Sequence, residues 1–173
     1  MSLPPVADAA IEVALEGADR PRSPVPKVVG ILLLVFGGLG LVVNLRGLLA
    51  VAGTAELFRD PAWRHVIRVQ QVDHAVSLAV AALQVYAGFR AVTYRQNAPR
   101  MAALYAWTSI LTTVALLAYA YLVALPALDA LAGARALIGA GMMFAGLLAI
   151  AWPIVVLALM SRPAARAACS NPF

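Results

Sequence analysis

Asp73 and His74 stand side by side near the start of a hydrophobic run, RVQQVDHAVSLAVAALQVYAGFRAVTYR (residues 68–95). A carboxylate beside an imidazole could relay a proton, bind a cation or contribute to a metal site. At 100° per residue, the polar and small residues of this run fall within an arc of about 100° on one face of a helix. They are Gln70, Asp73, His74, Ser77, Ala81, Gln84, Gly88 and Arg95. A polar face of this kind avoids lipid, so we expect it to point into the protein.

The next apolar run, residues 101–124, carries hydroxyl groups that match this face. Thr108 and Thr112, and Ser109 and Thr113, are each four residues apart and share a face of a helix. The sequence therefore predicts a polar seam between these two helices, either for interhelical hydrogen bonds or for a proton path. The candidate residues of this seam are Asp73, His74, Ser77, Gln84 and Thr112.

The position of the Asp73–His74 pair favours hydrogen bonding over a proton or cation relay. Asp73 lies about 13 Å from the midpoint of its apolar run, against a half-thickness of about 15 Å for the hydrocarbon core. A charge so near the membrane boundary is tolerated without any function, because water reaches it. The only histidines, His65 and His74, are nine residues apart and point in opposite directions on one helix. We therefore expect neither a metal nor a cofactor.

The composition is typical of a membrane protein. The chain has 173 residues, is 63% hydrophobic and 12% charged, and has a mean hydropathy of +0.87. Soluble domains are about 45–50% apolar and about 25% charged. The net charge is +5, but the basic residues lie at the ends of the apolar runs, which argues against a nucleic-acid partner. Since no nucleophile–base set can be assembled, we expect no enzyme activity.

Four apolar stretches of about 20 residues or more each predict membrane-spanning helices. They cover residues 28–49, 72–92, 101–124 and 134–160. The second and third, and the third and fourth, are joined by short connections, so these helices should be antiparallel neighbours. The second helix should begin near Pro61, because Asp60 can cap it and proline fits its first turn. The predicted fold class is an all-α membrane protein, a four-transmembrane-helix bundle spanning residues 27–161.

Two tails flank this transmembrane domain. Residues 1–26 contain Asp8, Glu12, Glu16 and Asp19 at spacings that put all four acids on one face of a helix. This segment is either a short acidic helix that docks on a partner or a solvated tail. Residues 162–173 are expected to form a short tail. Eight basic residues lie on the side of both termini and five on the other side, which favours cytoplasmic termini.

Small residues in the first and fourth apolar runs predict close helix packing. These candidate packing residues are Gly37, Gly38, Gly40, Gly141 and Ala145. Asn44 and Arg46 end the first run, and we expect their side chains to extend toward the outer membrane surface.

The segment PKVVGILLLVFGGLGLVVNL, residues 26–45, resembles the first span of small uncharacterised bacterial multi-span proteins. This resemblance implies a location in the bacterial inner membrane and implies no chemistry.

The sequence leads to two functional hypotheses. The first is a non-enzymatic accessory or assembly subunit that acts through helix–helix contacts, with the lipid bilayer and a protein partner or a second copy around it. The alternative is a small transporter or proton-coupled channel with a polar path along the second helix.

The orientation gives a direct prediction. Reporter fusions at Phe173 and within residues 54–60 should report opposite sides of the membrane, with Phe173 cytoplasmic. The measurement is paired alkaline phosphatase and green fluorescent protein activity, and reports from the same side at both positions would contradict the four-span topology.

Overall fold

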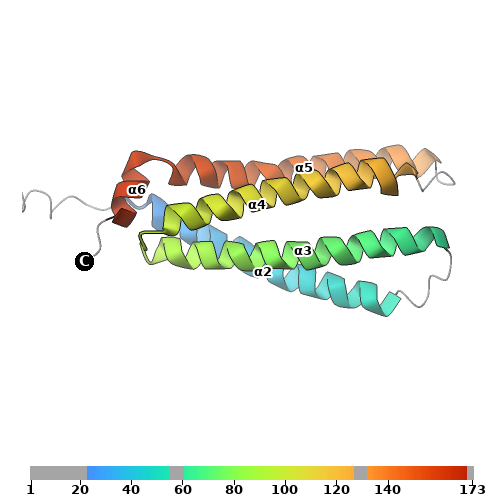
Figure 1. Ribbon diagram of the computed structural model, residues 1–173, viewed down its shortest axis with the longest axis horizontal. Coiled ribbons are helices and arrows are strands. Elements are labelled where there is room, and N and C mark those ends of the chain that lie inside the picture. The colour runs from blue at the N-terminus through green and yellow to red at the C-terminus, as the bar shows by residue number, and fades with distance from the viewer. Residues whose placement is uncertain (1–22, 55–60, 127–131, 171–173) are drawn as a thin grey trace, which may run out of the picture.

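The computed structural model describes residues 23–54, 61–126 and 132–170, and most of these residues are helical, with no strand among them. The helices are α2 (Val25–Thr54), α3 (Pro61–Val92), α4 (Ala98–Tyr119), the π-helical turn η1 (Ala120–Ala124), α5 (Ala132–Met160) and α6 (Pro163–Ser170). Consecutive long helices run antiparallel, and α6 lies at the end where α2 begins (Figure 1). Within the described ranges, four segments are long and apolar enough to cross a membrane: Val25–Gly53, Ile67–Val92, Ala98–Val123 and Gly139–Met160. The predicted fold class is confirmed.

The helices extend beyond the predicted apolar stretches. α2 continues past residue 49 to Thr54, and α3 begins at Pro61, as the sequence predicts. The segment 162–173, expected to be a tail, contains α6. Its Pro163 stands at the first helical position, and its buried residues are Ala165, Ala168 and Cys169. The acidic part of the N-terminal segment, residues 1–22, lies outside the described residues.

α2 and α3 are the most closely packed pair of helices. A Cβ atom added at Gly30 would lie 2.7 Å from the backbone nitrogen of Val92, and one at Gly37 would lie 3.0 Å from that of Val85. From the other side, a Cβ at Gly88 would lie 2.8 Å from the Gly30 carbonyl oxygen. The two backbones are therefore in direct contact, which maximises dispersion attraction between helices that lipid surrounds.

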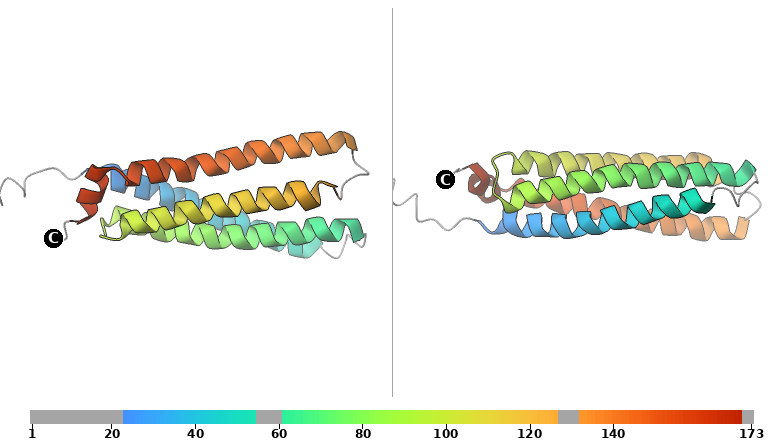
Figure 2. Two further views of the ribbon diagram at one scale, coloured as in Figure 1. Left: turned by 45° about the horizontal axis from the view of Figure 1, so that its top comes forward. Right: turned by 90° about the horizontal axis from the view of Figure 1, so that it is seen from below.

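A core of small buried residues joins the helices at the end that holds α6. It contains Val29, Leu33, Ala87, Ala91, Ala98, Ala102, Tyr105, Ala106, Val156, Met160 and Cys169. Figure 2 shows α6 lying across this end of the bundle. Because α2, α3, α4, α5 and α6 all contribute, this core fixes the two helix pairs, α2–α3 and α4–α5, against each other.

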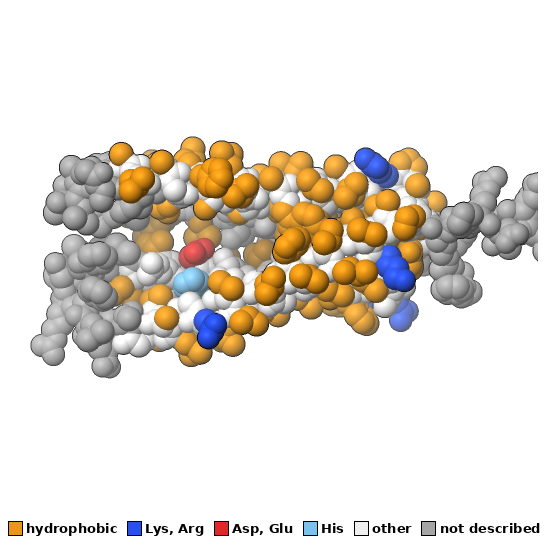
Figure 3. Space-filling model, turned by 180° about the vertical axis from the view of Figure 1, so that it is seen from behind, with side chains coloured by type: hydrophobic (Ala, Val, Ile, Leu, Met, Phe, Trp, Pro, Cys, Tyr) orange, Lys and Arg blue, Asp and Glu red, His pale blue; other side chains and the backbone are white. Residues whose placement is uncertain are grey.

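The outside of the bundle is apolar along the length of the helices. Leu111, Leu122 and Leu137 are among many large hydrophobic side chains that are more than half exposed. Figure 3 shows hydrophobic side chains over the long helices and basic side chains mostly toward one end. This is the pattern of a protein whose surrounding solvent is hydrocarbon.

Neighbouring glycines give a matched test of the α2–α3 contact. Gly37→Ala should lower the free energy of unfolding by about 1–3 kcal/mol, because the new methyl group meets the Val85 backbone. Gly38→Ala should leave it unchanged or raise it by up to about 1 kcal/mol, because nothing lies within 4 Å and alanine favours the helix. Unfolding in mild detergent, followed by circular dichroism, measures both; equal effects would contradict the packing described here.

Candidate functional site

A cavity of about 620 Å³ lies between the α2–α3 pair and the α4–α5 pair. Its polar side chains come from α2, α3 and α4: Asn44, Gln70, Asp73, Ser77, Gln84, Tyr105, Ser109, Thr112 and Thr113. The α5 wall is apolar and consists of Met142, Ala145, Gly146 and Ala149. On the face shown in Figure 3, acidic and histidine side chains lie next to each other at the edge of a hollow. The cavity is therefore amphipathic, with one hydrogen-bonding side and one hydrocarbon side.

Four of the five predicted seam residues line this cavity. They are Asp73, Ser77, Gln84 and Thr112. The Ser77 hydroxyl donates a hydrogen bond to Asp73 Oδ1 at 3.4 Å, which orients the carboxylate within the helix. Gln84, only 8% exposed, is the buried polar residue among those described and lies deeper in the membrane. The structure thus brings a carboxylate, hydroxyls and an amide around one space.

His74, the fifth predicted residue, faces α2. Its Nδ1 lies 3.2 Å from Asn44 Oδ1, and its ring covers Gly47. Asn44 Nδ2 donates to the Gly40 carbonyl oxygen at 2.8 Å, which leaves the amide oxygen free to accept. Since an amide oxygen only accepts, this contact requires a proton on His74 Nδ1. His74 therefore contributes to the α2–α3 contact.

The expectation that Asn44 extends toward the membrane surface is wrong. The side chain turns into the bundle, where it bonds to Gly40 and His74 and borders the cavity. A sequence signal was present: Asn44 follows Gly30 and Gly37 at intervals of seven, which places it on the face that packs against α3. Its amide forms hydrogen bonds with the Gly40 carbonyl oxygen and the His74 ring, which lipid could not provide.

The polar face of α3 is divided between two neighbours. His74, Ala81 and Gly88 form one edge of the arc and contact α2. Asp73, Ser77 and Gln84 form the other edge, about 60° around the helix, and line the cavity. The predicted seam with α4 is thus one half of a face whose other half packs on α2.

The cavity reaches Gln84 on α3 and Tyr105 on α4, about two thirds of the way along these spans toward the α6 end. Its innermost lining residues, Gln84 and Tyr105, adjoin the alanine-rich core at the α6 end. Closer to the α6 end, the small residues Ala87 and Ala102 are buried. The cavity and the alanine-rich core thus occupy different parts of the bundle.

The chemistry available in the cavity is that of one carboxylate among neutral hydrogen-bonding groups. Asp73 is the only acidic residue in the parts of the chain that the structure describes. Across those same parts, no group of three or more His, Cys, Asp or Glu side chains could hold a metal ion. The arrangement is suited to holding a solute through hydrogen bonds and one charge.

Comparison with known proteins gives no match, either to protein-family models, to curated proteins or to solved structures.

Adjacent residues on α4 test whether water reaches the cavity. In a Cys169→Ser background, Thr112→Cys should react faster with a charged, water-soluble thiol reagent than Leu111→Cys, because Leu111 is 66% exposed on the outer face. If Cys169 is kept instead of replaced, its own labelling should be slow, because the thiol is buried and burial raises its pKa. Labelling rates measured in liposomes decide the matter, and a faster rate at position 111 would contradict a hydrated cavity.

Proposed function

We propose that this protein is a non-enzymatic integral membrane protein that binds a small polar or cationic solute between its helix pairs, as a small transporter or proton-coupled channel. The observation that supports this is the convergence of Asp73, Ser77, Gln84 and Thr112, from two helices, on one cavity of about 620 Å³. Polar side chains inside a membrane protein are costly unless they bond to one another or to a bound species.

The walls of the cavity suggest the chemistry of the solute. Asp73 attracts a cation or carries a proton, and this attraction strengthens where water is excluded. The hydroxyls of Ser109 and Thr112 and the amide of Gln84 offer hydrogen bonds, whereas α5 offers only Met142 and small apolar residues. A solute with a cationic or hydrogen-bonding group on one side and an apolar body on the other matches both walls.

The closed inner end favours a carrier over a continuously open pore. The core around Ala87, Ala102 and Val156 blocks the way from the cavity to the α6 end. Transfer of a solute would require the α2–α3 and α4–α5 pairs to separate there. The α2–α3 pair packs more closely than any other pair of helices, which is compatible with its motion as one rigid unit.

An accessory or assembly subunit is the second candidate. Gly38 and Gly141 have nothing within 4 Å of an added Cβ atom, so each offers a small surface to a partner helix or a second copy. In contrast, Gly30, Gly37 and Gly88 are used within the chain. Because several of these glycines already pack against helices of the same chain, they are weaker support for an accessory subunit than the polar cavity is for solute binding.

We place the protein in the bacterial inner membrane with both termini in the cytoplasm. Eight basic residues near the membrane boundaries on the side of the termini, against five on the other side, support this orientation. The resemblance of residues 26–45 to bacterial first spans supports the location.

The carboxylate is the residue to test. In liposomes containing the full chain and an internal pH dye, Asp73→Asn should reduce protein-dependent proton flux at least about tenfold, because the amide neither carries a proton nor attracts a cation. Asp73→Glu should retain part of the flux, and Thr93→Ala, at an exposed position just after α3, should retain all of it.

Two results would contradict the transport function. One is wild-type flux no greater than that of empty liposomes. The other is unchanged flux in Asp73→Asn. If this variant instead alters only yield or assembly, and mild detergent recovers the wild-type chain with a defined partner or as a defined oligomer, the accessory-subunit function is favoured.

A further inference from the structure

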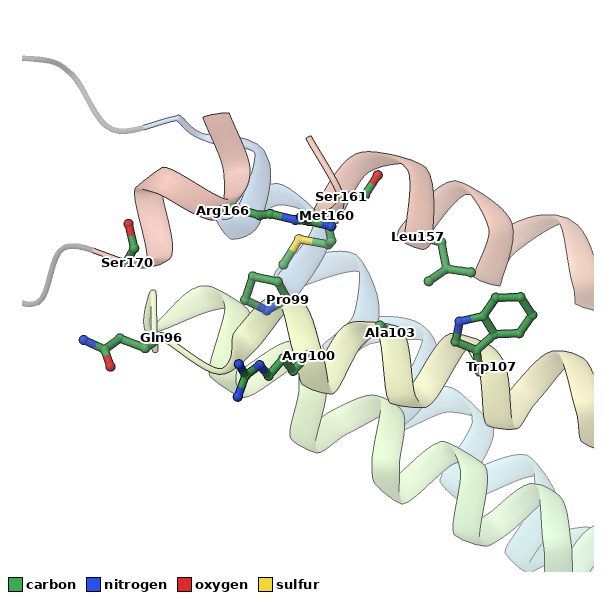
Figure 4. A pocket seen from close by; sticks show the side chains of 10 residues that line it. All are labelled: Gln96, Pro99, Arg100, Ala103, Trp107, Leu157, Met160, Ser161, Arg166 and Ser170. Carbon is green, nitrogen blue, oxygen red and sulfur yellow. The ribbon is translucent and has the colours of Figure 1, made fainter. Parts of the chain in front are cut away.

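A second cavity, of about 600 Å³, lies at the α6 end of the bundle, far from Asp73 along the helices. The start of α4, the end of α5 and α6 enclose it (Figure 4). Arg100 and Arg166 line it together with Gln96, Ser161, Trp107 and Leu157. Two arginines, the neutral donor Gln96 and the apolar side chain of Leu157 therefore border one space.

Neither of these guanidinium groups has a counter-ion among the described residues. The only acidic residue in the described parts of the chain is Asp73, which lies in the half of α3 that is farther from α6. Arg90, a neighbouring arginine, is already engaged, since its Nε donates to Asn97 Oδ1 at 2.7 Å and its guanidinium lies 5.8 Å from the centre of the Tyr86 ring. Arg100 and Arg166 are exposed and make no such contacts within the described parts of the chain. No described residue therefore neutralises their charge.

Polar and apolar parts of this cavity are separated along the membrane normal. Figure 4 shows the two arginines toward the end of the bundle, and Trp107 and Leu157 farther along α4 and α5. Arg100 and Trp107 are seven residues apart, or about 10 Å along the helix axis. Arg100 lies at the limit of the span Ala98–Val123, and Arg166 lies beyond the span Gly139–Met160. The arginines are thus at headgroup depth and the tryptophan at the level of the upper acyl chains.

We propose that this cavity binds one anionic phospholipid, with its phosphodiester on Arg100 and Arg166 and an acyl chain along Trp107 and Leu157. Arginine pairs with phosphate through two parallel N–H···O bonds, and two arginines on different helices can hold one phosphate from both sides. Such a lipid would tie α4 to α6 at the membrane boundary. This site is independent of solute binding near Asp73.

Titration of phosphatidylglycerol into the purified full chain, followed by native mass spectrometry in mild detergent, tests the proposal. The double variant Arg100→Gln/Arg166→Gln should weaken phosphatidylglycerol binding at least about tenfold, because two charged contacts to the phosphate are lost. The control Arg95→Gln/Arg162→Gln removes two exposed arginines at the same end that do not line the cavity, and should weaken binding less than about twofold. Circular dichroism checks that both variants are folded.

Additional titrations distinguish phosphatidylglycerol from other ligands that could fill this cavity. Phosphatidylcholine and millimolar inorganic phosphate should each fail to displace phosphatidylglycerol. The proposal is overturned if phosphatidylcholine binds equally well, if inorganic phosphate displaces the lipid, or if both double variants weaken binding equally. It is also overturned if deletion of residues 2–19 raises the affinity tenfold or more, because the acidic residues of that segment would then be the natural occupant of the cavity.

Discussion

The close approach of the α2 and α3 backbones is the contact on which the rest of the structure depends. Lipid is as apolar as a leucine side chain, so helices in a bilayer gain little from the hydrophobic effect against one another. Their association depends on dispersion contacts and hydrogen bonds, and both require short distances. Gly30 and Gly37 on α2 and Gly88 on α3 permit such distances, and the His74–Asn44 hydrogen bond extends the contact toward the end of the bundle where α3 begins.

This contact also fixes how α3 is rotated about its axis. Once His74, Ala81 and Gly88 face α2, the residues at the other edge of the polar face must point toward α4. Asp73 and Ser77 therefore meet Thr112 and its neighbours across a cavity. The glycines thus shape the candidate solute site without lining most of it.

Side-chain size makes the two ends of the bundle different. At the α6 end, alanines at positions 98, 102 and 106 let α4 approach its neighbours and form a solid core. Toward the other end, larger polar side chains of α4 face the small α5 residues Ala145 and Ala149 across the open space. The protein therefore has a carboxylate in its intramembrane cavity and arginines around a cavity at the opposite boundary. The two cavities therefore differ in the sign of the charged side chains that line them.

The sequence by itself determined the helical class, the four spans, the start of α3 at Pro61 and the polar face that carries Asp73, Ser77 and Gln84. These features follow from apolar length, capping residues and helical periodicity, which act within one segment. Only the tertiary structure decided that His74 turns to Asn44, that α6 packs on the core and that Arg100 and Arg166 share a cavity. Such pairings depend on the rotation and spacing of separate helices, and those are set by contacts between residues distant in the chain.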